Sequence, residues 1–196
     1  MEKYVKLLCV ILGIFWICSC ASQPISSPET KYEKESLHLQ LRSDPKLNFN
    51  SGMPHTLQVC VYQLRDPNAY NQLANDEDGL YQLLECSLFD MSVVSSKRLT
   101  VHPGRDLKIS LDRAEDAKYV AVVAGYYLIR KERITRLFEI PVVQKRRGFM
   151  LMNNYSTLGH LTIELMLGPK QIHSSRSEVG KPEEEKQEEE KTKEGK

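Results

Sequence analysis

Cysteine and histidine are the residue types in this 196-residue sequence whose spacing could support chemistry, and each occurs five times. No pair of histidines has the spacing of zinc ligands; they are His38, His55, His102, His160 and His173. The sequence contains no nucleophile-elbow motif and no glycine-rich phosphate loop, and its carboxylates form no recognisable acid–base arrangement. We therefore expect no enzyme, no catalytic residue, no metal site and no cofactor. The five cysteines are the remaining candidates for chemistry.

Cys20 ends an N-terminus that has the features of a secretory signal. Two lysines precede the apolar stretch 7–17, whose eleven residues are too few to span a bilayer, which needs about 20. Small Ser19 stands directly before Cys20, as in a bacterial lipobox, although Cys18 occupies a position where Ala, Ser or Thr is commoner. We expect cleavage after residue 19 and lipidation of Cys20. The alternative is an ordinary secreted protein with a cysteine near its cleavage site.

Ala21 and Ser22 follow the lipidated cysteine, and neither is an aspartate. By resemblance to enterobacterial lipoproteins, this favours the outer membrane, with the protein facing the periplasm. Stable anchoring takes two membrane signals, and bacterial lipoproteins carry three acyl chains, so we expect permanent attachment.

Cys60 and Cys86 remain as an even pair in what would be an oxidising compartment. A disulfide between them would close a 26-residue loop and contribute about 3–4 kcal/mol in the chain-entropy model. Two free, buried thiols are the alternative.

Composition divides the chain into four parts. We expect a signal peptide over 1–19, a lipidated flexible tether over 20–35, one folded domain over 36–168, and a disordered charged tail over 169–196. The formal net charge is +1, which gives no reason to expect nucleic-acid binding. We interpret the basic cluster 145–147 as a solvated loop.

The domain is predicted to be mainly β, because apolar residues alternate with polar ones in most of its segments. The expected strands cover 37–41, 56–64, 98–102, 107–111, 119–128, 138–142 and 161–167. The nearly uniform apolar run 119–128 predicts a central strand covered on both faces. Pro103-Gly104 is a turn signal that predicts a hairpin between the strands on either side. About seven short strands favour a two-sheet β-sandwich.

A short two-helix insertion over 66–87 interrupts the strands. Asp66 is the expected N-cap, with Pro67 at the first helical position, and Leu80, Leu83 and Leu84 share one face of the second helix. The strand 56–64 is apolar on both faces, so the insertion is the natural cover for its second face, which would bring Cys86 towards Cys60. We interpret Asp112-Arg113 as a structural, salt-bridged turn.

Several segments in order resemble the type VI secretion lipoprotein family TssJ. They are Val-Cys-Val-Tyr-Gln-Leu at 59–64, Leu-Leu-Glu-Cys at 83–86, Phe-Asp-Met-Ser-Val at 89–93, Val-His-Pro-Gly at 101–104, Leu-Asp-Arg-Ala-Glu at 111–115 and Tyr-Val-Ala-Val-Val-Ala-Gly-Tyr-Tyr at 119–127. The resemblance covers about 36–167. It implies a transthyretin-like sandwich with a helical elaboration. It also implies an outer-membrane lipoprotein that binds the periplasmic domain of TssM, in a complex that also contains TssL.

The resemblance further implies that the loop between the first two strands, 43–55, contacts TssM. Leu47-Asn48, Gly52 and Pro54 match the family pattern, whereas Asn50 stands where Asp is often found, which puts a charge-based contact in doubt. The loop is long and holds apolar residues without a period that would bury them. The candidate contacts are Asp44, Lys46, Leu47, Asn48, Phe49, Asn50 and Met53. The alternative is that Leu47 and Phe49 pack back onto the sandwich.

Two other functions fit a lipid-anchored sandwich. One is a periplasmic transthyretin-like module that binds a small ligand or glycan. The other is a lipid-anchored enzyme.

Overall fold

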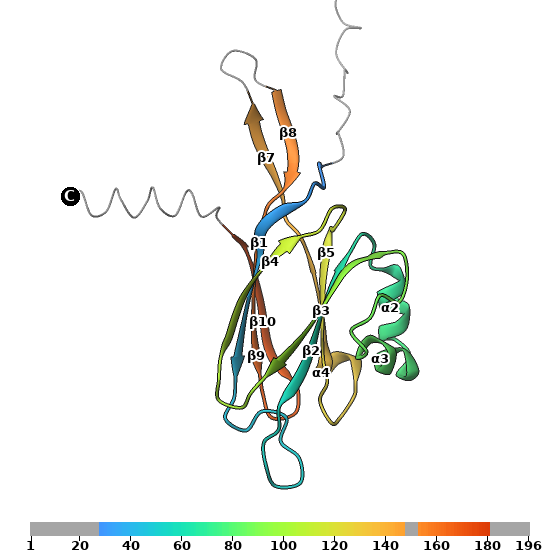
Figure 1. The fold of residues 1–196 in the computed structure, drawn as a ribbon, viewed down its shortest axis with the longest axis vertical. Coiled ribbons are helices and arrows are strands. Elements are labelled where there is room, and N and C mark those ends of the chain that lie inside the picture. The colour runs from blue at the N-terminus through green and yellow to red at the C-terminus, as the bar shows by residue number, and fades with distance from the viewer. Residues whose placement is uncertain (1–27, 148–152, 181–196) are drawn as a thin grey trace, which may run out of the picture.

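Two four-stranded sheets face each other in a computed structural model that describes residues 28–147 and 153–180 (Figure 1). The first sheet has the order β10-β9-β1-β4 and the second the order β3-β2-β5-β6. The strands of the first sheet are β1 (Glu33–Ser43), β4 (Leu107–Arg113), β9 (His160–Leu167) and β10 (Ile172–Gly180). The strands of the second are β2 (Leu57–Leu64), β3 (Val93–Val101), β5 (Tyr119–Ala124) and β6 (Thr135–Glu139). A separate hairpin is formed by β7 (Val142–Arg147) and β8 (Asn153–Leu158).

The core lies between the sheets and is built from the predicted alternation. Strand β1 is central in its sheet, antiparallel to β4 and parallel to β9, and Leu39 is paired with Ile109 on one side and Ile163 on the other. Leu39 and Ile163 are fully buried. The mainly β, two-sheet sandwich is therefore confirmed, with ten strands in the described residues where about seven were expected.

The predicted helical insertion covers the outer face of the second sheet (Figure 1). It consists of α2 (Asn68–Ala74) and α3 (Glu77–Leu83), and a one-turn helix, α4 (Lys131–Ile134), lies before β6. Helix α3 is capped at its start, because the Asp76 carboxylate accepts a hydrogen bond from the Gly79 amide at 2.9 Å. Helix α2 begins one residue later than expected: Pro67 is its N-cap, not Asp66. Among the described residues, no helix has the length and hydropathy needed to cross a membrane.

One connection and the bounds of two strands differ from the prediction. The turn at Pro103-Gly104 does not close a hairpin, because β3 pairs with β2 and β4 pairs with β1, in different sheets. The turn instead carries the chain from one sheet to the other at an edge of the sandwich. The strand expected over 119–128 ends at Ala124, and the strand expected over 138–142 is split between β6 and β7.

Described residues beyond both predicted ends of the domain belong to the fold. Residues 172–180 form β10, which pairs antiparallel with β9, so the prediction of a disordered tail from residue 169 is wrong for this segment. The tether expected over 20–35 is also wrong at its C-terminal end. Glu29 forms an isolated parallel bridge with Thr157, and the Asp116 amide donates to the Thr30 carbonyl at 2.8 Å. The segment from residue 28 therefore already packs on the domain.

Strand directions define two ends of the sandwich. At the tether end, residue 28 joins the fold, β1 begins, and the β7–β8 hairpin projects (Figure 1). At the loop end, β1 leaves the sheet and three connections come together: the β1–β2 loop (44–56), the segment 125–130 after β5, and the turn 168–171 between β9 and β10.

Candidate interaction site

The β1–β2 loop is an ordered hairpin at the loop end. The Asn50 amide donates to the Met53 carbonyl at 3.0 Å, and the Met53 amide donates back to the Asn50 carbonyl at 3.1 Å. Between them, Ser51 and Gly52 both have positive φ angles, of 50° and 84°. Two consecutive left-handed residues make a tight reversal, which glycine favours at one of the two positions. The loop therefore presents a defined surface.

Leu47 and Asn48 point into the sandwich, which corrects two of the candidate contacts. Leu47 is fully buried in the core, and Asn48 is 5% exposed. The side-chain Nδ2 of Asn48 donates to the Thr56 carbonyl at 3.1 Å, and its side-chain Oδ1 accepts from the backbone amide of Tyr127 at 3.2 Å. These residues hold the loop in place, and neither is available to a partner.

The remaining candidates lie on the surface. Met53 is 55% exposed, Lys46 is exposed, and Asp44, Phe49 and Asn50 are half-buried. Two of them, Phe49 and Asn50, line a pocket of about 290 Å³, whose other lining residues are Asn48, Tyr126, Tyr127, Leu128, Pro169 and Lys170. An exposed apolar residue beside a pocket is the kind of feature that anchors a protein partner.

Sequence reasoning missed Tyr127 and Leu128 as members of this surface. Both were assigned to a central strand, yet Tyr127 is 60% exposed and its ring meets that of His55 edge-on, with centroids 5.3 Å apart. Gly125, which follows the last residue of β5, was the available signal that the strand ends there.

Tyr126 is buried between the exposed residues and the core. Its hydroxyl donates to the Gln171 carbonyl at 2.9 Å, and burial raises the pKa of this phenol. The hydrogen bond ties the segment after β5 to the β9–β10 turn, so all three connections of the loop end are fixed to one another.

A disulfide joins Cys60 on β2 to Cys86, just after α3, with their Cα atoms 5.1 Å apart. Beside it, the Tyr62 hydroxyl donates to the Leu83 carbonyl at 2.6 Å, and burial raises the pKa of Tyr62 to about 12. The helical insertion is thus attached covalently and by hydrogen bonds to the outer face of the second sheet.

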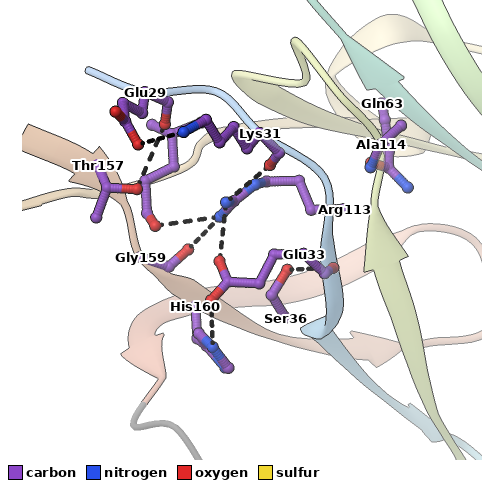
Figure 2. A network of polar contacts seen from close by, with 11 residues as sticks. Glu29, Lys31, Glu33, Ser36, Gln63, Arg113, Ala114, Thr157, Gly159 and His160 are labelled. Carbon is purple, nitrogen blue, oxygen red and sulfur yellow. Dashed lines mark hydrogen bonds and ion pairs between the residues drawn. The ribbon is translucent and has the colours of Figure 1, made fainter.

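A buried arginine fixes the other end of the molecule (Figure 2). Arg113, at the end of β4, is 2% exposed. Its guanidinium donates to the carbonyls of Leu158, Gly159 and Lys31 at 3.1–3.2 Å. It therefore holds the incoming chain, the base of the hairpin and the end of β4 together.

Glu33 completes this cluster. Its carboxylate lies 2.8 Å from the Arg113 guanidinium and 3.2 Å from the imidazole of His160 (Figure 2). Loss of hydration lowers the pKa of Arg113, and the Glu33 charge opposes that shift. Asp112-Arg113 was expected to be a salt-bridged turn, but both residues lie at the end of strand β4, and Arg113 forms its ion pair with Glu33.

Cys20 lies outside the described residues. Within the described part of the chain, no group of three or more His, Cys, Asp or Glu residues is placed to hold a metal ion.

The fold is similar to that of a solved secretion lipoprotein. The T6SS lipoprotein TssJ1 from Pseudomonas aeruginosa matches with a TM-score of 0.55 and 17% identity, over 79% of this chain and all of that one. Lip of Serratia marcescens, a membrane-bound component of the type VI secretion system, matches with a TM-score of 0.48 and 17% identity, over 72% of this chain and 96% of that one. A chain of a type VI membrane complex matches with a TM-score of 0.49 and 16% identity, over 78% and 100%.

No curated protein sequence matches the chain. The sequence model of one family does match, over residues 35–170, and that family is described as the type VI secretion lipoproteins VasD, EvfM and TssJ. This range includes nearly the whole sandwich, from β1 to the turn before β10. The chain therefore belongs to the type VI secretion lipoprotein family, which is a structural component of the secretion system and not an enzyme family.

Proposed function

We propose that this chain is the outer-membrane lipoprotein of a type VI secretion membrane complex. Acyl chains on Cys20 hold it on the periplasmic face of the outer membrane. Its loop end binds the periplasmic domain of TssM, within a complex that also contains TssL. Membership of the family supports a role in type VI secretion. The fold supports an anchor at the tether end and a partner-binding surface at the loop end.

The observation that carries the proposal is the position of the β1–β2 loop. Residue 28 joins the fold at the tether end, and the loop lies at the opposite end of β1 (Figure 1). A domain anchored through its N-terminus can therefore present the loop away from the membrane. The exposed side chains of Met53 and Tyr127 lie at that end, and Phe49 and Tyr127 line the pocket there.

Calorimetry with the periplasmic domain of TssM tests the binding site. Deleting the loop is unsuitable, because Leu47 would leave the core. We instead expect Met53→Glu to weaken binding at least about 10-fold, since a charge placed in an apolar contact of this kind costs more than about 1.4 kcal/mol. Met91→Glu is the matched control, because Met91 is 86% exposed and lies before β3, at the tether end.

The outcomes separate the parts of the proposal. Equal affinity of the two variants would place the contact elsewhere on the molecule. An unsubstituted chain that does not bind would refute TssM as the partner. Acyl labelling tests the anchor independently, because Cys20→Ser should abolish the label and release the protein from membranes.

A further inference from the structure

The β7–β8 hairpin projects from the sandwich, and no layer formed by residues 28–147 or 153–180 covers it (Figure 1). Its strands pair with each other over six positions, from Val142↔Leu158 to Arg147↔Asn153, and belong to neither four-stranded sheet. Glu29 contacts this hairpin near its base, at residues 156–158. A two-stranded hairpin without further packing is marginally stable in water, so this element is expected to rest against another surface.

The hairpin points in the direction from which the chain arrives. The bridge between Glu29 and Thr157 is parallel, and the Glu29 amide donates to the Ser156 carbonyl at 2.9 Å. Because β8 runs from Asn153 at the far end of the hairpin to its base, a parallel neighbour also arrives from the far end. The far end therefore lies on the same side as the chain that leads back to Cys20.

The length of chain from Glu29 back to Cys20 is comparable with the length of the hairpin from Thr157 to Asn153. Glu29 lies nine positions after Cys20 in the sequence, and nine residues span about 15–18 Å as a random coil, or about 30 Å when fully extended. The four-residue step from Thr157 to Asn153 carries the hairpin about 13 Å in the same direction. If Cys20 is acylated, the far end of the hairpin is thus held close to the lipid headgroups.

The charge of the hairpin is uniformly positive. Lys145, Arg146 and Arg147 occupy the far half of β7, and neither strand contains an aspartate or glutamate. In register, their partners are the uncharged Tyr155, Asn154 and Asn153. Basic residues held at a membrane surface attract anionic lipids.

We propose that the two strands of this hairpin form a lipid-contact element that binds the anionic headgroups of the membrane holding the acyl chains of Cys20. The contact orients the sandwich, with its loop end facing away from that membrane. The inference goes beyond the proposed function and rests on its lipid anchor.

Headgroup quenching in vesicles tests the contact. The acylated chain is reconstituted with phosphatidylcholine alone or with about 30% phosphatidylglycerol, in the presence of a nitroxide-headgroup lipid. A fluorophore is attached to Asn153→Cys at the far end of the hairpin, and the control carries it on Ser51→Cys at the loop end. The native cysteines do not compete, since Cys60 and Cys86 are bonded and Cys20 is acylated.

We expect strong quenching at position 153 in anionic vesicles, weak quenching in neutral vesicles or high salt, and none at position 51. The combined change Lys145→Glu, Arg146→Glu and Arg147→Glu should lower the contact equilibrium at least about 100-fold, from three basic contributions near the surface. Equal quenching at both positions, or no dependence on anionic lipid, would overturn the inference. So would a charge-reversal variant that loses affinity for the TssM domain and keeps its lipid contact, since that result makes the hairpin a protein-binding surface.

A second arm separates this inference from the lipid anchor. The chain from residue 21, which keeps every described residue, is attached through an N-terminal histidine tag to nickel-chelating lipids in the same vesicles. Quenching at position 153 in this arm supports the hairpin contact even if Cys20 proves not to be acylated. Its absence here, with acylation of Cys20 demonstrated, would refute the hairpin contact alone.

Discussion

Replacing Arg113 by methionine should destabilise the domain strongly and locally. Methionine keeps part of the aliphatic volume but removes every donor of the guanidinium. The carbonyls of Leu158 and Gly159, both buried residues, would lose a partner, and the Glu33 carboxylate, 29% exposed, would lose its counter-charge. Removing one member of a buried ion pair costs about 3–5 kcal/mol. Since native domains are stable by only about 5–15 kcal/mol, the loss is a large part of the total.

Urea unfolding followed by circular dichroism measures this loss. We expect Arg113→Met to lower the free energy of unfolding by about 4 kcal/mol and the control Arg176→Met by less than about 1 kcal/mol. Arg176 is a suitable control because its ion pair with Glu178 is largely exposed. Adding Glu33→Gln to Arg113→Met should cost less than the sum of the two single changes, because both remove the same interaction.

Hydrogen exchange locates the effect. In Arg113→Met, the amides of Glu29 and Asp116 should exchange faster, because their hydrogen bonds hold residues 28–33 and the base of the hairpin to the domain. Stability equal to that of the control variant, or unchanged exchange at these two amides, would refute the assignment of Arg113 as the residue that fixes the incoming chain.

Three further predictions concern stability. Leu47→Ala should cost about 2–5 kcal/mol in urea unfolding, and Met53→Ala less than about 0.5 kcal/mol, because only the first side chain is buried; equal costs would contradict the inward position of Leu47. Reducing the disulfide, which closes a separation of 26 residues, should lower stability by about 3–4 kcal/mol, and an unchanged midpoint in reductant would argue against it. The hydroxyl of Tyr32 and a backbone amide lower the pKa of the Asp112 carboxyl, so its stabilising contribution is present above pH 3.8 and is lost as the pH falls through the lowered value. Asp112→Asn should therefore lose less stability than the unsubstituted chain between pH 6 and pH 3, and an equal loss would contradict this role.

The sandwich itself could be predicted from the sequence, because apolar and polar residues alternate along its core strands. Leu39 in β1 and Ile163 in β9 each belong to an alternating run, and the structure places both in the core. The prediction of a hairpin at Pro103-Gly104 was wrong, because a turn signal shows that the chain reverses but not which strand the next segment pairs with.

Strand β10 had no comparable signal. It buries only Ile172 at its start, and the rest of its side chains are largely exposed. It is held in the sheet by backbone hydrogen bonds to β9, which depend on a neighbour and leave no pattern in the sequence. The same limit applies to the candidate site. Leu47 and Met53 have similar hydropathy and lie six residues apart in one loop, so only the path of the backbone decides which of them faces solvent.

The central position of β1 has a mechanical consequence. This strand begins beside the segment that leads to the proposed anchor and ends at the loop proposed to bind the partner. Tension between a membrane at one end and a secretion apparatus at the other would run along eleven residues of a single covalent backbone. The hydrogen bonds of the sheets would lie across that line of force and would not have to carry it. Such a sandwich would withstand a pulling load applied along β1 without unfolding.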